Sequence, residues 1–245
     1  MPAALRGQPR GGPHRILRRG GYPAGRPRRP APLGGALLER GAQCRDRQRH
    51  GIFTGCTLQC CYCQNYKISQ QGLGKPLTAE RLAEIFMELQ QKGAKNLNLV
   101  TATQWLPWVT QALDAARRNG LTLPVAYNTG GYETVETVKA LAGYVDIWLA
   151  DYKYASPALA KELSAAQDYP QVAHAAIRQM LLQTGAPVYD ADGYLQKGVI
   201  VRHLALPGHT DDSFAVLALL AHPVLPRRGA RFGAAHYHLR IPQSG

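Results

Sequence analysis

GCTLQCCYCQNYKIS, residues 55–69, is the segment of this 245-residue chain from which most of its expected chemistry follows. Cys56, Cys60 and Cys63 form a Cys-x3-Cys-x2-Cys spacing, and Tyr62 stands directly before the last cysteine. Sulfur ligands select iron–sulfur clusters, zinc or copper(I) over hard cations. The spacing therefore predicts a site for a soft metal or a cluster.

The loop offers three ligands rather than four. Cys61 follows Cys60 directly, and neighbouring side chains of an extended loop point apart, while Cys44 lies in a different segment. A structural zinc site needs four protein ligands. A four-iron cluster on three cysteines keeps one iron open to a small molecule, which predicts a reactive centre. The ordinary alternative for such cysteines is a buried apolar or disulfide role.

Composition and length favour one large α/β domain. With 245 residues and 45% hydrophobic content, the chain can bury a sizeable core. Five cysteines, clustered and odd in number, fit a reducing cytoplasm better than a disulfide framework. No stretch reaches the roughly 20 apolar residues of a membrane span, and the N-terminus lacks an apolar signal region. We expect a cytoplasmic protein without a membrane partner.

Most of the positive charge lies in one segment. Residues 1–50 hold twelve arginines, no lysine and two acids, so they supply +10 of the net charge of +13. This segment is rich in Pro and Gly without apolar periodicity, and we expect it to be mostly disordered. The alternatives are a basic arm that binds nucleic-acid phosphates or a misread start or reading frame. Residues 222–245 form an irregular tail without a strand and helix cycle.

Residues 51–221 alternate short apolar runs with amphipathic stretches. We expect strands at 52–54, 97–100, 123–127, 145–150 and 199–206, and helices at 78–93, 105–119, 132–142, 156–184 with a break near Pro170, and 211–220. Such a cycle predicts a parallel sheet in a curved or barrel-like α/β fold. Polar residues follow the strands, and reacting groups of such folds gather there. They are Thr101, Thr103, Asn128, Thr129, Asp151, Lys153, Arg202 and His203.

Four motifs carry a resemblance to a known family. CTLQCCYCQN, NTGGY, DYK and VRHLALPGHTDD occur in the family's order over about residues 51–220. With them the chain resembles the radical S-adenosylmethionine superfamily, and within it pyruvate formate-lyase activating enzyme. The resemblance implies a partial (β/α)6 TIM-like barrel and a [4Fe-4S] cluster on Cys56, Cys60 and Cys63, with S-adenosylmethionine on the fourth iron. It also implies reductive cleavage of that cofactor to a 5′-deoxyadenosyl radical, which abstracts hydrogen from a substrate.

The resemblance also implies roles for residues beside the cluster. Tyr62 packs beside the adenine, and Asn65 orders the cluster loop. Asp151 and Lys153 match positions that contact the ribose and methionine parts of the cofactor, which suits a carboxylate facing hydroxyls and an ammonium facing a carboxylate. The ordinary alternative for this pair is a solvated ion pair at a strand end.

Three further positions are expected to contact the cofactor. The family's Gly-Gly-Glu turn holds the methionine amino group, but this chain has Thr-Ala-Thr-Gln at 101–104, so backbone carbonyls and the Thr103 hydroxyl would replace it. Asn128 is a cofactor contact or an ordinary turn residue. Arg202 and His203 alternate on a strand, so only one can face the site, and the motif register favours Arg202, with His203 as a packed surface histidine.

Three functions remain open from the sequence. The leading one is a radical S-adenosylmethionine enzyme that takes electrons from a partner such as flavodoxin or ferredoxin and activates a glycyl-radical enzyme or modifies another substrate. The second is a non-enzymatic zinc or iron–sulfur module whose arginine arm binds nucleic acid. The third is a plain electron carrier.

Overall fold

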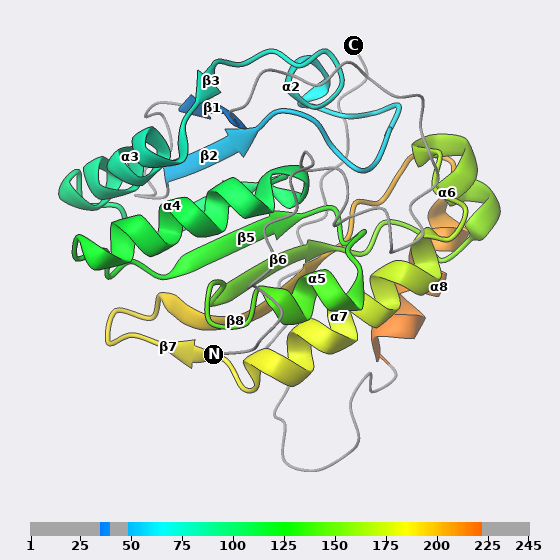
Figure 1. Cartoon of the computed structure of the whole chain (residues 1–245). Coiled ribbons are helices and arrows are strands. Elements are labelled where there is room, and N and C mark those ends of the chain that lie inside the picture. The colour runs from blue at the N-terminus through cyan, green and yellow to red at the C-terminus, as the bar shows by residue number, and fades with distance from the viewer. Residues whose placement is uncertain (1–34, 40–48, 222–245) are drawn as a thin grey trace. The chain divides into compact units, whose positions relative to one another are not determined.

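The computed structural model describes residues 35–39 and 49–221, and Figure 1 shows their arrangement. The strands are β1 (Gly35–Glu39), β2 (Arg49–Phe53), β3 (Pro76–Leu77), β4 (Leu97–Val100), β5 (Val125–Thr129), β6 (Ile147–Asp151), β7 (Val188–Tyr189) and β8 (Leu195–Arg202). The helices are α2 (Tyr66–Ser69), α3 (Ala79–Gln91), η2 (Thr103–Trp105, a 3-10 turn), α4 (Leu106–Arg118), α5 (Val135–Ala140), α6 (Pro157–Ser164), α7 (Tyr169–Thr184) and α8 (Thr210–Ala221).

The strands form one mostly parallel sheet in the order β3-β1-β2-β4-β5-β6-β8-β7. β2, β4, β5, β6 and β8 run parallel to one another, while β1, β3 and β7 are antiparallel additions at the two edges. Helices connect the parallel strands, as a parallel sheet requires. The predicted α/β fold with a partial barrel is confirmed, although a sixth parallel strand is not found among the residues described.

The helices begin and end where the sequence supplies caps. The Thr78 side chain accepts a hydrogen bond from the Arg81 backbone at the start of α3, and the helix buries Leu82, Phe86 and Leu89. α7 begins immediately before Pro170, which stands in its first turn, where the missing N–H costs nothing. The predicted break near Pro170 is therefore confirmed, and it separates α6 from α7.

The two faces of the sheet carry different residues. Asn128 pairs with Leu149 across β5 and β6, and Asp151 pairs with Arg202 across β6 and β8. Because side chains alternate along a strand, Asn128, Asp151 and Arg202 share one face. Tyr127 and Trp148 lie on the other face, fully buried, with ring centroids 5.4 Å apart.

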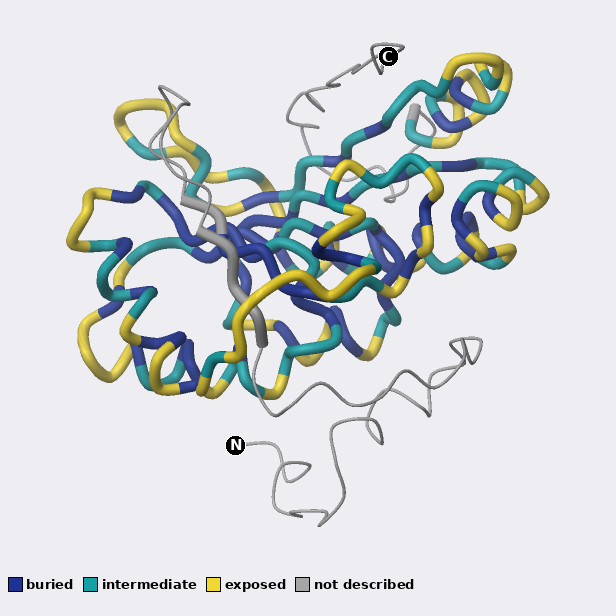
Figure 2. Tube along the Cα trace, turned by 90° about the horizontal axis from the view of Figure 1, so that it is seen from above, coloured by how far each residue is buried: buried dark blue, intermediate teal, exposed yellow. Residues whose placement is uncertain are grey.

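The helix layer covers the face that carries these aromatic rings. Helices α3, α4, α5 and α7 lie along this side of the sheet (Figure 1). Figure 2 shows that the buried residues concentrate along the central strands and the exposed ones on the outer turns. The core therefore lies between sheet and helices, which leaves the face of Asn128, Asp151 and Arg202 for the site.

The chain ends need one correction. Residues 1–50 are predicted to be mostly disordered, but Gly35–Glu39 forms β1, and β2 already begins at Arg49. The reason is backbone pairing, because β1 completes ladders with both β2 and β3. The rest of the arginine-rich segment and the tail 222–245 lie outside the described residues. In the part of the chain that is described, no helix combines the length and the hydropathy of a membrane span.

Candidate metal centre

The cysteine loop leaves the carboxyl end of β2 and is fixed at both sides. Gly55 has a positive φ of 85°, where a side chain would be strained, and its N–H donates to the carbonyl of Ile68 in α2. On the other side, the N–H groups of Gln59 and Cys61 donate to the carbonyls of Ser164 and Leu163. These carbonyls belong to the last turn of α6 and have no partner within their helix. The end of α6 therefore holds the middle of the loop.

Each of the three predicted ligand sulfurs has a hydrogen-bond donor beside it. The Leu58 N–H lies 3.4 Å from Cys56 Sγ, and the Ser164 hydroxyl lies 2.9 Å from Cys60 Sγ. Cys63 Sγ lies 3.2 Å from the hydroxyl of Ser69. Such donors stabilise charge on a thiolate, and this is the form that binds metal.

Cys56 and Cys60 are desolvated, and neighbouring thiols contribute to the pKa of each. Burial raises the pKa of Cys56 to about 11, with smaller contributions of the same sign from Cys60 and Cys63. Burial also raises the pKa of Cys60, while the positive charge of Lys153 opposes that rise. A metal that binds a cysteine displaces the thiol proton. The raised pKa values therefore shift metal binding to higher pH but do not prevent it.

Three thiols around a cluster meet a different demand from three ligands around one ion. Within residues 35–39 and 49–221, no three His, Cys, Asp or Glu side chains are grouped to hold a single metal ion. In a four-iron cluster each cysteine binds a different iron, so the three cysteine sulfurs do not have to converge on one point. The residues fit such a cluster through one short loop, three mutually interacting thiols and a donor for each sulfur.

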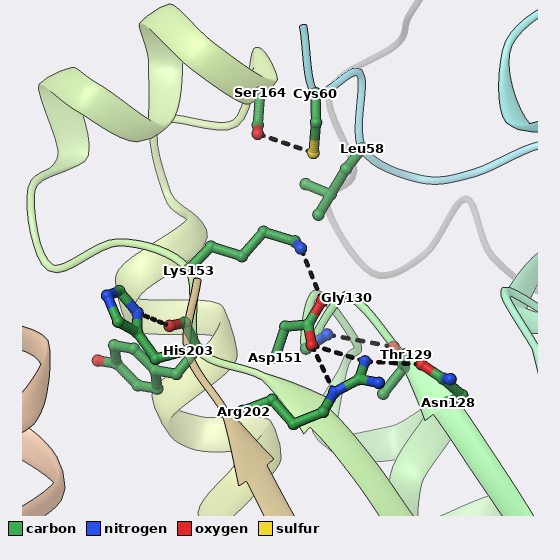
Figure 3. A network of polar contacts seen from close by, with 12 residues as sticks. Leu58, Cys60, Asn128, Thr129, Gly130, Asp151, Lys153, Ser164, Arg202 and His203 are labelled. Carbon is green, nitrogen blue, oxygen red and sulfur yellow. Dashed lines mark hydrogen bonds and ion pairs between the residues drawn. The ribbon is translucent and has the colours of Figure 1, made fainter. Parts of the chain in front are cut away.

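An ion-pair network lies beside this loop, at the carboxyl ends of β5, β6 and β8 (Figure 3). The Asp151 carboxylate accepts from Lys153 Nζ at 2.7 Å through one oxygen and from Arg202 Nε at 2.8 Å through the other. Arg202 Nη2 also donates to Asn128 Oδ1 at 2.7 Å. Four predicted site residues, at the ends of three neighbouring strands, are therefore brought together.

The ion-pair network stabilises the charged forms of Asp151 and Lys153. Burial alone would raise the pKa of Asp151, but Lys153 and Arg202 outweigh it and keep that pKa below its usual value. For Lys153, burial would lower the pKa, and the Asp151 carboxylate outweighs it in turn. The side chains of both are less than a quarter exposed. A charged, partly desolvated pair of this kind suits a polar ligand that carries hydroxyl and carboxylate groups.

Gly130 and Gly131 bring the network against the cysteine loop. A Cβ at Gly130 would lie 2.9 Å from Leu58 of the loop and 3.6 Å from the Lys153 side chain. A Cβ at Gly131, where φ is 79°, would lie only 2.0 Å from the backbone oxygen of Asp151. The contact at Gly131 requires glycine, and the contacts at Gly130 show that loop and network border the same space.

Two predicted residues lie in the cysteine loop itself. Tyr62 is partly buried, and its hydroxyl is hydrogen-bonded to that of Tyr154. Asn65 is the N-cap of α2, where its backbone carbonyl accepts from Ile68 and Ser69, although its side chain makes no capping bond. Their predicted contacts with a cofactor stay predictions.

The structure does not bring Thr103 into this group. Thr103 is 4% exposed, and its hydroxyl donates to Glu133 Oε1 at 2.7 Å while accepting from Tyr127. Both partners belong to the helix side of the sheet. Thr101 adopts a left-handed conformation, with φ of 54°, and the 3-10 turn η2 follows it. This backbone path directs the Thr103 side chain to the helix side of the sheet.

His203 packs away from the site as expected, but it is buried rather than on the surface. Its Nδ1 lies 2.8 Å from the Tyr152 carbonyl, and its Nε2 lies 2.9 Å from the Ser213 hydroxyl. Because the carbonyl can only accept, Nδ1 carries the proton, and Nε2 accepts from the serine when the ring is neutral.

Four supporting residues were not identified from the sequence. Ser164 and Tyr154 contact the cysteine loop, and the Tyr169 hydroxyl accepts from the Lys153 N–H at 2.8 Å. The Asp212 carboxylate accepts from the Ser156 N–H at 2.7 Å and so fixes the start of α6. The DYK and PGHTDD motifs pointed to the neighbourhood of Tyr154 and to Asp212, whereas no local pattern marks Ser164 or Tyr169.

Comparison with known proteins gives one curated relative and two solved structures among the matches. Uncharacterized protein MJ0674 of Methanocaldococcus jannaschii is 30% identical over 169 residues, which cover 65% of this chain and 45% of that protein. The structure described as native anSMEcpe with bound AdoMet has a TM-score of 0.45 at 13% identity, and covers 69% of this chain and 47% of its own. HydG, a maturase of the [FeFe]-hydrogenase, has a TM-score of 0.47 at 15% identity, and the match covers 69% of this chain and 37% of HydG.

These matches extend over only part of the known proteins, since the chain spans about 45% of the length of the curated relative. The family model described as Radical SAM superfamily, by contrast, matches residues 51–221, from the start of the cysteine loop's strand to the end of α8. On this match, the chain belongs to the radical SAM superfamily, whose members use a [4Fe-4S] cluster and S-adenosylmethionine.

Proposed function

We propose that Cys56, Cys60 and Cys63 bind the [4Fe-4S] cluster and that the neighbouring network binds S-adenosylmethionine. The observation that carries the proposal is the nearness of the cysteine loop to the ion-pair network. A Cβ at Gly130 would meet both Leu58 of the loop and the Lys153 side chain, and the Lys153 charge acts on Cys56 and Cys60. The cofactor has to touch the cluster, so its polar groups need partners within a few ångströms of the loop. The network supplies such partners there.

The roles follow from the charges. Lys153 presents an ammonium that can pair with the methionine carboxylate, and Asp151 presents oxygens that can accept from ribose hydroxyls. Arg202 and Asn128 hold Asp151 in place through a shared set of hydrogen bonds. Tyr62, in the loop, offers its ring to the adenine. Thr103 is left out of the proposal because its hydroxyl is engaged with Glu133.

When bound, the cluster supplies the electron that cleaves S-adenosylmethionine to methionine and a 5′-deoxyadenosyl radical, which then takes a hydrogen atom from the substrate. The protein's own contribution is to fix the distance between cysteine loop and network and to exclude water. The electron comes from outside the chain, and we propose a small carrier such as flavodoxin or ferredoxin as its source.

Adjacent cysteines offer a matched test. Cys60 is buried beside Ser164, whereas its neighbour Cys61 is exposed and lies outside the ligand set. After anaerobic reconstitution with iron and sulfide, Cys61→Ala should keep the thiolate-to-iron absorbance and form 5′-deoxyadenosine when given dithionite and S-adenosylmethionine. Cys60→Ala should lose both. Equal iron content and equal product in the two variants would refute the ligand assignment.

We further propose that the substrate is a glycine residue of a glycyl-radical enzyme. The support is the order of the four sequence motifs, which is that of pyruvate formate-lyase activating enzyme. The test is the electron paramagnetic resonance doublet of a glycyl radical on pyruvate formate-lyase incubated with the reduced protein and S-adenosylmethionine. Formation of 5′-deoxyadenosine without that doublet would overturn this substrate for pyruvate formate-lyase while leaving the cleavage reaction in place.

A further inference from the structure

A row of three hydroxyl groups ends on the sulfur of Cys60. The hydroxyl of Tyr62 is hydrogen-bonded to that of Tyr154, which lies 2.6 Å from Ser164 Oγ. Ser164 Oγ in turn lies 2.9 Å from Cys60 Sγ. Tyr154 and Ser164 are at most 1% exposed, so water does not compete for these bonds.

The direction of the row is fixed once the sulfur is a metal-bound thiolate. A thiolate has no proton to donate, so the Ser164 hydroxyl must donate to Cys60. Ser164 has a single proton, so Tyr154 must donate to Ser164, and Tyr62 must donate to Tyr154. All three dipoles then point toward the sulfur, and hydrogen bonds in such a chain strengthen one another.

The other two sulfurs have weaker donors. Cys56 has a backbone N–H at 3.4 Å, and Cys63 has a hydroxyl at 3.2 Å in a partly buried position. The distance from donor to sulfur is shortest at Cys60, at 2.9 Å. It stands on the last residue of α6, whose carbonyl also accepts from Gln59, so its position follows that of the loop.

We propose that the Tyr62, Tyr154 and Ser164 row raises the reduction potential of the cluster by stabilising negative charge on the Cys60 sulfur. Reduction adds one electron, and part of its charge falls on the ligand sulfurs, so donors to sulfur favour the reduced form. Ser164 and Tyr154 are thereby positioning residues that act through Cys60. The inference rests on the proposed assignment of Cys60 as a ligand.

The test is a redox titration of the reconstituted protein, followed by electron paramagnetic resonance, with iron and sulfide measured in each sample. At a fixed potential, Ser164→Ala should lower the ratio of reduced to oxidised cluster about tenfold, which is 59 mV for a one-electron couple. Ser164→Thr keeps the hydroxyl and should restore most of the ratio. Tyr154→Phe keeps the bond from Ser164 to Cys60 but removes its polarising neighbour, so its effect should have the same sign and be smaller.

Thr110→Ala is the matched control, because it removes a hydroxyl that bonds only to carbonyls of its own helix α4. Its potential should equal that of the unchanged protein. If Ser164→Ala fails to take up iron, the titration of Tyr154→Phe decides: a lower potential supports the inference and an unchanged one overturns it. Full iron content with equal potentials in all variants would overturn the inference and leave the proposed function standing. An unchanged protein without any cluster would defeat the function itself.

Discussion

Glu133 provides the sharpest prediction about stability, because this carboxyl group is buried and no cation of the described residues acts on it. The side chain is 1% exposed, and its Oε1 accepts from the hydroxyls of Thr129 and Thr103 at 2.6 and 2.7 Å. Its Oε2 has no hydrogen-bond partner among the described residues. Burial raises the pKa of Glu133 from 4.5 to about 7, although the two threonine hydroxyls oppose the rise.

The sign of the pH effect follows from these values. Below pH 4.5 Glu133 is protonated in both the folded and the unfolded state, and its contribution to stability is complete. Between pH 4.5 and about 7 only the unfolded chain loses the proton, so the free energy of unfolding falls as pH rises. At about 1.4 kcal/mol per pH unit, the total loss is about 3 kcal/mol, of which about 2 kcal/mol falls between pH 5.5 and 8.

Glu133→Gln has the shape of the protonated acid and cannot ionise. The measurement is urea unfolding of the reconstituted protein, followed by circular dichroism without oxygen. The free energy of unfolding of the variant, relative to that of the unchanged protein, should rise by about 2 kcal/mol from pH 5.5 to pH 8. The same change at the exposed Glu136 is the control for replacing a carboxyl by an amide. If the free-energy difference for Glu133→Gln changes no more between the two pH values than that for Glu136→Gln, burial does not hold the proton on Glu133 and the argument is wrong.

Two further substitutions probe the parts of the structure around the ion-pair network. Asp151→Asn leaves Lys153 and Arg202 without their carboxylate, and we expect it to lower the free energy of unfolding by about 3 kcal/mol. It should also weaken S-adenosylmethionine binding at least tenfold, measured by equilibrium dialysis. An affinity within a factor of two of that of the unchanged protein would contradict the proposed role of Asp151. Tyr169→Phe removes the acceptor of the partly buried Lys153 N–H, which should lower the free energy of unfolding by about 1–3 kcal/mol in chemical denaturation. Tyr194→Phe changes an exposed tyrosine and should leave the unfolding transition unchanged.

The sequence was sufficient where the signal is local or periodic. Cys56, Cys60 and Cys63 lie within eight residues, and Asn128, Asp151 and Arg202 stand at or near the ends of predicted strands, where polar groups of such a fold gather. Their contacts then follow from strand order in a parallel sheet. For the same reason, the α/β architecture and most helix positions could be predicted from caps and apolar spacing.

The sequence was insufficient where a side chain comes from a helix far along the chain. Ser164 lies 104 residues from Cys60 and is the last residue of the short helix α6, where no sequence pattern marks a serine as functional. Thr103 was placed at the site because it follows a strand, but the left-handed turn at Thr101 directs it to the helix layer. Which way a loop side chain points depends on such backbone turns, and a single sequence does not reveal them.

The same long-range contacts bear on how the cysteine loop becomes ordered. Much of the loop is polar and exposed, with Leu58 as its buried anchor, so it gains little from apolar burial. Fixing one residue costs about 1–2 kcal/mol, which is close to what one hydrogen bond contributes. The bonds from α6 reach Gln59, Cys60 and Cys61 but not Cys56 or Cys63. The two ends of the loop are held instead from α2, through Gly55 N–H to Ile68 and Cys63 Sγ to Ser69. If the proposed ligand assignment is right, binding of the metal would add further order at Cys56 and Cys63.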